Sequence, residues 1–419
     1  MAKKADFRVK DLSLSKQGML NIAYAESKMP LMMRIRERVG KEKPFAGLTI
    51  GLALHVTKET AVLVRTLRAG GAKVAIASCN PLSTQDDVAA ALAKEGVSVF
   101  AKKGESKEEY YTYIEKVIAH KPDITIDDGC DLVTALHTRH KDKLEKVIGG
   151  CEETTTGVIR LRAMEADGAL RYPVIAVNDN RTKHLLDNYY GTGQSTIDGI
   201  LRATNTLIAG KSFVVCGYGD CGKGVALRAK GMGANVIVTE VDALRAMQAV
   251  LDGYRVMPIA NAAKTGDIFL TVTGDKGVIT LDHIKSMKNG AILANSGHFD
   301  CEVDVSSLNK KYKRKRIRPF LDEYDVNGKK IYLCAEGRLV NLGAAEGHPS
   351  EVMATSFAGQ VLACVYLIEN KDRLEKAVIR LPEELDDKIA ELQLEAMGVK
   401  KDKLTKEQDK YLHSWKEGT

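Results

Sequence analysis

The chain has 419 residues, and this length predicts two or three domains rather than one. Its 44% hydrophobic and 28% charged residues form an ordinary globular balance, which excludes a disordered or fibrous protein. The net charge of +7 equals the seven basic residues of segment 310–318, so the rest of the chain is neutral and does not indicate a nucleic-acid partner.

Short apolar runs alternate with helical patterns from residue 47 onward. The runs predict buried strands at 48–54, 73–78, 97–100 and 124–126. Helices are expected between them, over 61–67 and from Asp86 to Leu92, the second capped by the Ser83 side chain. Strands that are apolar throughout and separated by helices are typical of a parallel sheet covered on both faces.

A second series of the same kind begins near residue 213. Its strands are expected at 213–216, 236–239, 268–271, 291–294 and 331–333. We therefore predict an α/β fold with two doubly wound parallel-sheet domains. The polar, turn-rich bridge 177–193 would be the hinge between them, and the cleft between the two halves would hold the ligand.

The C-terminal residues predict two short helices. Pro382 stands at a helix start with Glu383 and Glu384 in the first turn, and Thr405 with Gln408 forms a capping box. Because these helices are too small to bury a core alone, we expect them to dock on another domain or subunit.

The segment Gly217-Tyr218-Gly219-Asp220-Cys221-Gly222 follows a predicted strand and opens a helix. Its glycines allow a tight turn and let backbone N–H groups approach a pyrophosphate at the helix N-terminus. Glu240, at the end of the next strand, would accept hydrogen bonds from the ribose hydroxyls of NAD and disfavour NADP. A glycine-rich turn of an ordinary α/β unit is the competing interpretation, but the context favours NAD binding.

Three further polar clusters stand at predicted strand ends or loops, at 55–60, 127–131 and 152–157. Each has a structural explanation as well. Glu59 could complement a helix dipole, Asp131 could cap a helix, and the threonines of the third cluster could form an edge strand. Three such clusters together with a nucleotide-binding motif favour a catalytic site.

Ten motifs occur in a characteristic order, at 83–86, 127–129, 152–157, 177–179, 182–183, 187–188, 217–222, 297–300, 337–342 and 347–350. In this order they resemble the S-adenosyl-L-homocysteine hydrolase family over nearly the full chain. The resemblance implies reversible cleavage of S-adenosylhomocysteine into adenosine and homocysteine, with one tightly bound NAD per subunit. The implied route is oxidation of the ribose 3′-hydroxyl, elimination of homocysteine, addition of water and re-reduction.

The resemblance also implies roles for individual residues. Lys183 and Glu153 would handle the 3′-hydroxyl proton, and a lysine with a lowered pKa would suit that work. Asp128 would take the C4′ proton, and His55 would protonate the leaving sulfur. The implied catalytic set is His55, Asp128, Glu153, Lys183, Asp187, Asn188 and His298. The implied substrate-binding set is Thr57, Glu59, Asp128, Glu153, Lys183, Asp187, His298 and His348.

Within the substrate set, Thr57 and Glu59 would read the adenine edge, Glu59 by accepting from the exocyclic amine, and Asp187 would anchor the ribose. The implied NAD-binding set is Thr154, Thr155, Thr156, Asn188, Gly217, Gly219, Asp220, Cys221, Gly222, Lys223, Gly224, Glu240, Arg245, Ser296, Gly297, His298, Asn341 and His348. No metal site is expected. We assign 1–180 with 349–380 to a substrate domain, 190–346 to an NAD-binding Rossmann domain and 381–419 to a helical oligomerisation tail.

The chain departs from the family pattern at three places. Thr192 stands where the family often has Cys, and Arg245 where it often has Asn. Many relatives also continue beyond the position of Thr419 with Lys and Tyr residues that reach a neighbouring subunit's NAD. We expect a homo-oligomer, in the family usually a tetramer, with this contact missing or rebuilt.

Three alternatives remain. A relative that hydrolyses S-inosylhomocysteine would share the mechanism, but an acceptor at Glu59 favours a base that carries an amine. A net oxidoreductase, such as a 2-hydroxyacid dehydrogenase, would have to exchange NAD at every turnover. A non-catalytic homologue is disfavoured by the intact His55, Asp128, Lys183 and Asp187.

The cysteines and the chain start bear on the compartment. Eight cysteines occur singly, without a C-x-x-C pair, which indicates reduced thiols and a cytoplasmic protein. Residues 1–6 do not resemble a signal peptide, and no run of about eighteen uninterrupted apolar residues predicts a membrane span. His137 with His140 and the basic run 310–318 are interpreted as solvated surface, rather than as metal ligands or a targeting patch.

Overall fold

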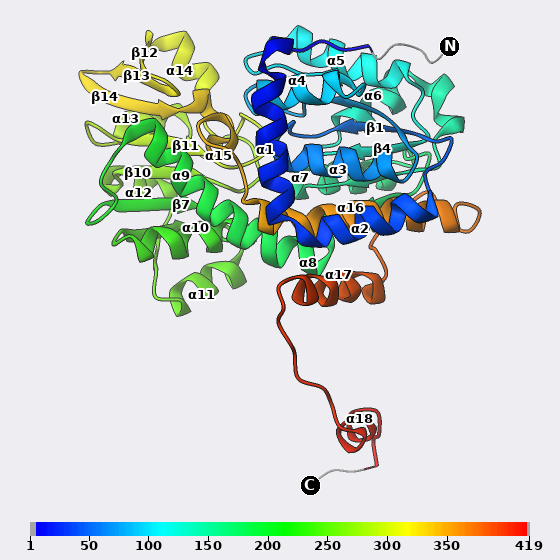
Figure 1. The fold of residues 1–419 in the computed structure, drawn as a ribbon. Coiled ribbons are helices and arrows are strands. Elements are labelled where there is room, and N and C mark those ends of the chain that lie inside the picture. The colour runs from blue at the N-terminus through cyan, green and yellow to red at the C-terminus, as the bar shows by residue number, and fades with distance from the viewer. Residues whose placement is uncertain (1–5, 417–419) are drawn as a thin grey trace.

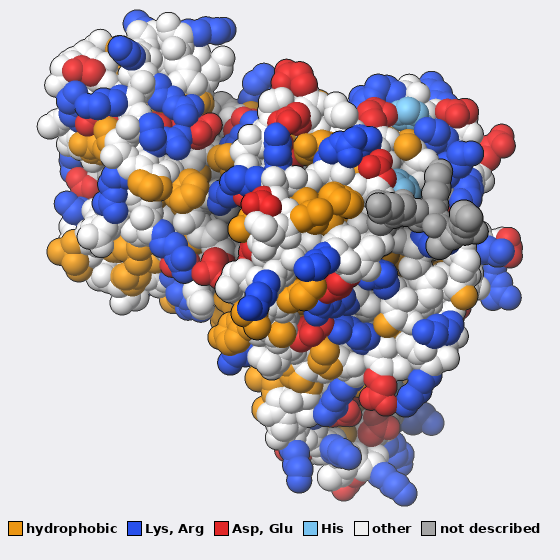
Figure 2. Space-filling model, turned by 45° about the horizontal axis from the view of Figure 1, so that its top comes forward, with side chains coloured by type: hydrophobic (Ala, Val, Ile, Leu, Met, Phe, Trp, Pro, Cys, Tyr) orange, Lys and Arg blue, Asp and Glu red, His pale blue; other side chains and the backbone are white. Residues whose placement is uncertain are grey.

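The computed structural model describes residues 6–416, so residues 1–5, which the expectation about a signal peptide concerns, lie outside the described range. Two α/β lobes lie side by side, each built around its own sheet (Figure 1). The first lobe holds β1–β6 and the returning C-terminal strand β15, and the second lobe holds β7–β14. Basic and acidic side chains are interspersed over the face of the molecule that Figure 2 shows.

The sheet of the first lobe has the strand order β15-β6-β5-β4-β1-β2-β3, and all neighbouring strands are parallel. Its strands are β1 (Thr49–Ala53), β2 (Lys73–Ala77), β3 (Ser98–Phe100), β4 (Ile124–Asp127), β5 (Gly149–Glu152), β6 (Val174–Ala176) and β15 (Val378–Ile379). Its helices are α1 (Ser15–Lys28), α2 (Pro30–Glu42), α3 (Lys58–Ala69), α4 (Asp86–Lys94), α5 (Lys107–Ala119), α6 (Asp131–Arg139), α7 (Thr155–Ala166), α16 (Ser350–Asn370) and α17 (Glu383–Ala396). Short 3-10 turns lie at Leu12–Leu14, Lys141–Lys146 and Val177–Asp179. The four predicted strands of this half are confirmed. Helices pack on both faces of the sheet, and this packing buries the strands on both sides.

The strand order creates a crevice where chain connections leave in opposite directions. β1 pairs with β2 on one side and with β4 on the other, so the carboxyl ends of β1 and β4 diverge there. His55 follows β1 and Asp128 follows β4. The corresponding point in the second lobe lies between β7 and β10, where the glycine segment 217–222 follows β7.

The sheet of the second lobe is mixed, not wholly parallel as predicted. Its order is β12-β13-β14-β11-β10-β7-β8-β9, and β12, β13 and β14 form an antiparallel meander at one edge. The strands are β7 (Ser212–Cys216), β8 (Asn235–Thr239), β9 (Arg255–Val256), β10 (Ile268–Thr271), β11 (Ile292–Asn295), β12 (Arg314–Arg318), β13 (Leu321–Val326) and β14 (Lys329–Cys334). The helices are α9 (Thr192–Thr204), α10 (Asp220–Gly231), α11 (Ala243–Leu251), α12 (Ile259–Thr265), α13 (Leu281–Ser286), α14 (Val305–Lys311) and α15 (Val340–Gly343), with a 3-10 turn at Ala335–Gly337.

The meander has local causes in the sequence. Asn327 and Gly328 both have positive φ and form the two-residue turn between β13 and β14, a signal for a hairpin. The basic run 310–318 is exposed, as expected, and it spans the end of α14 and the edge strand β12. Arg314 and Arg316 pair with acids of the neighbouring segments, and these pairs neutralise part of the run.

The bridge between the lobes is helical, so the prediction of a turn-rich segment is wrong. A short helix α8 (Arg181–Lys183) leads into a π-helical segment, η4 (His184–Gly191), which continues as α9. The polar residues of this bridge are compatible with a helix because their side chains face the site described below. A β-carbon on Gly224 of α10 would overlap the carbonyl oxygen of Tyr189, so the bridge packs directly against the glycine-rich helix start.

Helix α16 brings the C-terminal part of the chain back to the first lobe, where it contacts α2, α3 and β5. It is long and apolar enough to cross a membrane, but 61% of its apolar window is buried inside the protein. It is therefore a core helix of the first lobe. The predicted helices after it are confirmed: α17 carries Glu383 and Glu384 in its first turn, and the Thr405–Gln408 capping box starts α18 (Lys406–Leu412). α17 docks on α16 and α2, whereas α18 projects away from both lobes (Figure 1).

The close packing of α1 on α4 can be tested at a glycine. A β-carbon on Gly18 would overlap the backbone carbonyl of Asp87, which cannot move independently of its helix. We expect Gly18→Ala to destabilise the protein by about 1–3 kcal/mol in chemical denaturation. Gly231→Ala is the matched control, because nothing lies within 4 Å of its added carbon. A Gly18→Ala variant as stable as the control would contradict this packing.

Candidate active site

A cavity of about 790 Å³ lies between the two lobes. Fourteen of the residues proposed from the sequence line it: His55, Thr57, Glu59, Asp128, Glu153, Thr154, Lys183, Asp187, Asn188, Cys221, Ser296, His298, Asn341 and His348. Those that do not line it are Thr155, Thr156, Gly217, Gly219, Asp220, Gly222, Lys223, Gly224, Glu240, Arg245 and Gly297. Every residue proposed for catalysis or substrate binding therefore lines one cavity, together with some of the residues proposed for the cofactor.

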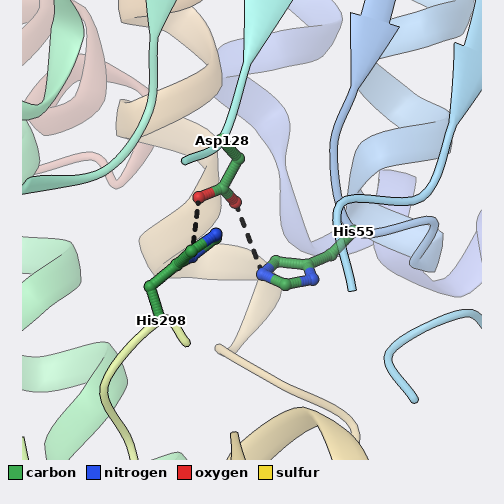
Figure 3. A group of neighbouring side chains, drawn as sticks. All are labelled: His55, Asp128 and His298. Carbon is green, nitrogen blue, oxygen red and sulfur yellow. Dashed lines mark ion pairs between the residues drawn. The ribbon is translucent and has the colours of Figure 1, made fainter. Parts of the chain in front are cut away.

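Asp128 lies between two histidines at the crevice of the first sheet (Figure 3). His55 Nε2 is 3.4 Å from one carboxylate oxygen of Asp128, and His298 Nδ1, from the second lobe, is 3.4 Å from the other. Gly129, with φ of 105°, makes this approach possible, since a β-carbon there would overlap the His298 ring. The contact between Asp128 and His298 thus joins the two lobes at the site.

The ionisation of this group follows from its burial. Burial lowers the pKa of His55 to about 4, although the charge of Asp128 opposes the shift. His55 is therefore neutral at neutral pH and can accept a proton. One carboxylate and two imidazoles whose atoms lie within 4.8 Å of one another are also a set that suits a divalent cation, but each histidine is already satisfied here by its contact with Asp128.

Ser83 has a different role from the one predicted. It does not cap α4, which has Gln85 at its N-cap position without a side-chain hydrogen bond. The Ser83 hydroxyl instead lies 2.8 Å from Nδ1 of His55 and donates to the carbonyl of Asn80. Ser83 thereby orients the His55 ring so that Nε2 faces Asp128. The Ser-x-x-Asp spacing predicts a helix cap and does not indicate this role.

Lys183 stands at the centre of a buried charged group. Its Nζ donates to Asn188 Oδ1 at 2.8 Å and lies 3.5 Å from Asp187 Oδ2. Glu153 Oε1 is 3.8 Å away on the other side. Burial lowers the pKa of Lys183, but Asp187 and Glu153 raise it above its ordinary value. The expected lowering of this pKa is therefore wrong, because two carboxylates hold the proton on the amine.

The two carboxylates differ in their own ionisation. Burial raises the pKa of Glu153 to about 7, against the lowering effect of Lys183. Burial also acts to raise the pKa of Asp187, but Lys183 and His348 lower it to about 2. His348 Nδ1 lies 2.8 Å from Asp187 Oδ1. Asp187 is thus a fixed anion, whereas Glu153 is the member of the group that can exchange a proton near neutral pH.

Glu59 closes the other end of the cavity. It is 2% exposed, and its Oε1 accepts from Ser350 Oγ at 2.6 Å and lies 3.3 Å from Lys58 Nζ. Both contacts are at one carboxylate oxygen, so Oε2 is the atom that would accept from a ligand. The Thr57 hydroxyl accepts from the backbone N–H of Thr60 as the N-cap of α3, and the cap fixes the start of the helix that carries Glu59.

The glycine segment fits a dinucleotide. β-Carbons on Gly222 or Gly224 would overlap backbone carbonyls, whereas the Cα of Gly219 has open space before it, as expected where backbone approaches a phosphate. Glu240, just after β8, accepts from the backbone N–H of Tyr218 and so lies beside the glycine turn. Asn341 lines the cavity with a buried Oδ1 that has no hydrogen-bond partner among residues 6–416. The close backbone at Gly222 and Gly224 and the unsatisfied Asn341 oxygen fit NAD. Both Glu240 oxygens already accept from backbone N–H groups, so its contact with a ribose stays a prediction.

The remaining cofactor residues are placed around this cradle. Thr154 is the N-cap residue of α7, so Thr155 and Thr156 lie in the first turn of that helix. Arg245 is exposed on α11, with its guanidinium near Gly219. The Asp220 carboxylate, inside the glycine segment, lies 2.9 Å from His184 Nδ1, and this contact lowers the pKa of the carboxyl group.

The two histidines interpreted as solvated surface both contact other residues of the chain. His137 is buried, accepts from the backbone N–H of Arg171 and contacts the Val133 carbonyl, so its expected exposure was wrong. His140 pairs with Glu115.

Comparison with known proteins agrees with this geometry. A family model described as "S-adenosyl-L-homocysteine hydrolase" matches residues 6–143, and one described as "S-adenosyl-L-homocysteine hydrolase, NAD binding domain" matches residues 188–347. An S-inosyl-L-homocysteine hydrolase of Methanocaldococcus jannaschii is 58% identical over 99% of this chain and 100% of its own length. Adenosylhomocysteinases of Saccharolobus solfataricus (58%) and Aquifex aeolicus (57%) match with the same coverage.

The chain belongs to the S-adenosyl-L-homocysteine hydrolase family. It is a hydrolase with an NAD-binding domain, so the predicted family and cofactor are confirmed. The matched NAD-binding region contains the glycine segment, Glu240 and Asn341. A net oxidoreductase is not supported by these matches.

The ionisation of His55 can be followed directly. We expect its imidazole to titrate far below the ordinary value of 6.5 in NMR spectra of ring-labelled protein, with a pKa of about 4. Asp128→Asn should lower this pKa further, because the aspartate charge favours the imidazolium form. A His55→Gln variant assigns the resonance. Titration near 6.5, or a rise in Asp128→Asn, would contradict the geometry.

Proposed function

We propose that the chain hydrolyses S-adenosyl-L-homocysteine to adenosine and L-homocysteine, reversibly, at the cavity between the lobes. The observation that carries the choice of substrate is the Glu59 carboxylate, buried at one end of that cavity with Oε2 available to accept from the base. The relatives do not decide it, because an inosyl and an adenosyl enzyme are equally similar to the chain.

NAD, when bound, supplies a reversible oxidant for the ribose 3′-carbon, and the ketone makes the neighbouring C4′ proton acidic. Glu153 accepts the proton of the 3′-hydroxyl, since it is the carboxylate with a pKa of about 7. Lys183 stays an ammonium and orients that hydroxyl, held in place by Asn188. Asp187 binds the ribose hydroxyls as a permanent anion.

The elimination uses the second group of residues. Asp128 takes the C4′ proton and passes it to neutral His55, whose Nε2 lies 3.4 Å away. His55 then protonates the sulfur as the C5′–S bond breaks, so the proton lost from carbon leaves with homocysteine. In the second half, water gives a proton to His55 and its oxygen to C5′, and the steps run in reverse.

We also infer a cytoplasmic homotetramer. Exposed apolar side chains on α11 (Leu244, Met247 and Leu251) and around the projecting α18 (Leu404, Tyr411, Leu412 and Trp415) support association between copies. Eight cysteines that form no disulfide within residues 6–416 fit a reducing compartment.

Thiol release from S-adenosylhomocysteine and S-inosylhomocysteine, measured in parallel on purified protein, tests the proposed substrate. We expect preference for the adenosyl compound without added cofactor. Glu59→Gln should weaken that preference by about 10- to 100-fold, because an amide can donate to the carbonyl of the inosyl base. Glu59→Asp, which keeps the acceptor, is the control. Inosyl preference in the unaltered protein would overturn the assignment of Glu59, and no release from either compound with NAD added would overturn the reaction.

The role of Lys183 is tested by the first chemical step alone. Lys183→Ala should slow reduction of bound NAD by adenosine about 100- to 10,000-fold, since the hydroxyl loses the group that orients it, while NAD content stays unchanged. Lys310→Ala, in the exposed basic run, is the control. Normal reduction in Lys183→Ala would remove Lys183 from the mechanism.

A further inference from the structure

Two buried side chains of α16 hold the carboxylate that the mechanism uses as a base. Ser356 Oγ donates to Glu153 Oε1, and Gln360 Nε2 donates to Glu153 Oε2 at 2.5 Å. Ser356 and Gln360 are both 0% exposed, and Glu153 is 5% exposed. Their spacing of four residues places both donors on one face of the helix, above the end of β5.

Gln360 makes this contact at a cost to stability. Its Oε1 is buried without a hydrogen-bond partner among the described residues, and a buried acceptor that lacks a partner destabilises the folded state. An apolar residue would avoid that cost within a helix that is otherwise largely hydrophobic. The contact that the amide does make is the one to Glu153.

We propose that Ser356 and Gln360 are positioning residues that fix Glu153 as an oriented anion, ready to accept the ribose 3′-hydroxyl proton. The proposal rests on the proposed function, in which Glu153 performs that step. By this proposal, helix α16 belongs to the active site, although it lies outside both regions matched by the family models. Each oxygen of Glu153 has one donor, so the carboxylate cannot rotate away from Lys183.

Other charges act on Glu153 as well. Lys183 on α8 favours its anion, whereas Asp187 on η4 and Asp128 after β4 disfavour it, and burial disfavours it most strongly. The Glu153 anion is therefore stabilised by one ammonium and by the two hydrogen-bond donors of α16. Two neighbouring carboxylates and the burial of the site act in the opposite direction. Removing one donor should shift Glu153 toward its protonated form, which cannot act as a base.

The same helix holds Glu59 through Ser350. Ser350 and Ser356 thus contact different carboxylates, Glu59 and Glu153, and substitutions at the two positions should have different effects. Ser350→Ala should weaken adenosine binding without moving the pH dependence of the oxidation step.

The test is the rate of NAD reduction by adenosine in the NAD-loaded full chain, measured as a function of pH. In Gln360→Met we expect the acidic limb to move up by about one pH unit, so that the rate at neutral pH falls about fivefold and recovers at alkaline pH. Ser356→Ala should behave alike, and Ser356→Thr, which keeps the hydroxyl, should restore the normal profile. Thr355→Val is the matched control, since its buried hydroxyl bonds to its own helix at Val352.

A second measurement does not depend on turnover. Carbon-13 NMR of labelled glutamate in substrate-free protein should show Glu153 titrating at higher pH in Gln360→Met than in the parent, with Glu153→Gln assigning the resonance. A rate that falls equally at all pH values, or an unchanged Glu153 titration, would overturn the proposal. Failure of the unaltered protein to reduce NAD with adenosine would instead refute the proposed function. If Gln360→Met does not fold, the same two measurements are made on Ser356→Ala.

Discussion

The burial of one ammonium among carboxylates is the constraint on which the site depends. Lys183 lies within 4 Å of Asp187 and Glu153, and none of the three side chains is more than 7% exposed. A buried charge is tolerated when it is paired, so the three must stay together once the lobes have folded. Their arrangement leaves a net negative charge. The Asn188 carbonyl oxygen accepts from Lys183, and His348 and the side chains of α16 contact the carboxylates, so these groups replace the water that is missing.

That constraint explains why the bridge between the lobes is helical. Lys183 and Asp187 are four residues apart and both must point into the same cavity, which a helical turn achieves and an irregular loop does not. The π-helical register of 184–191 then presents Asp187 and Asn188 inward. The bridge therefore carries part of the site, and the contact of Asp128 with His298 completes it from the second lobe.

Much of the site could be predicted because its residues follow strands. His55 and Asp128 come directly after β1 and β4, and the glycine segment follows β7, so local patterns place each at a sheet edge. Residues whose role depends on distant contacts were missed. Ser83 contacts His55 instead of capping a helix, and Ser350 ends the motif 347–350 but contacts Glu59, 291 positions away. Ser356 and Gln360 lie in no motif. The antiparallel meander was missed although Asn327-Gly328 is a local hairpin signal.

The amino-acid sequence by itself determined the family, the cofactor and the two-lobed α/β fold, because apolar periodicity and motif order are properties of the chain that need no contacts. The tertiary structure alone decided the protonation of the site. Lys183 retains its proton, His55 loses its proton more readily than usual, and Glu153 is left as the group that exchanges one near neutral pH. These shifts arise from burial and from polar groups brought together from distant parts of the sequence, as in the contact between Gln360 and Glu153, which are 207 positions apart.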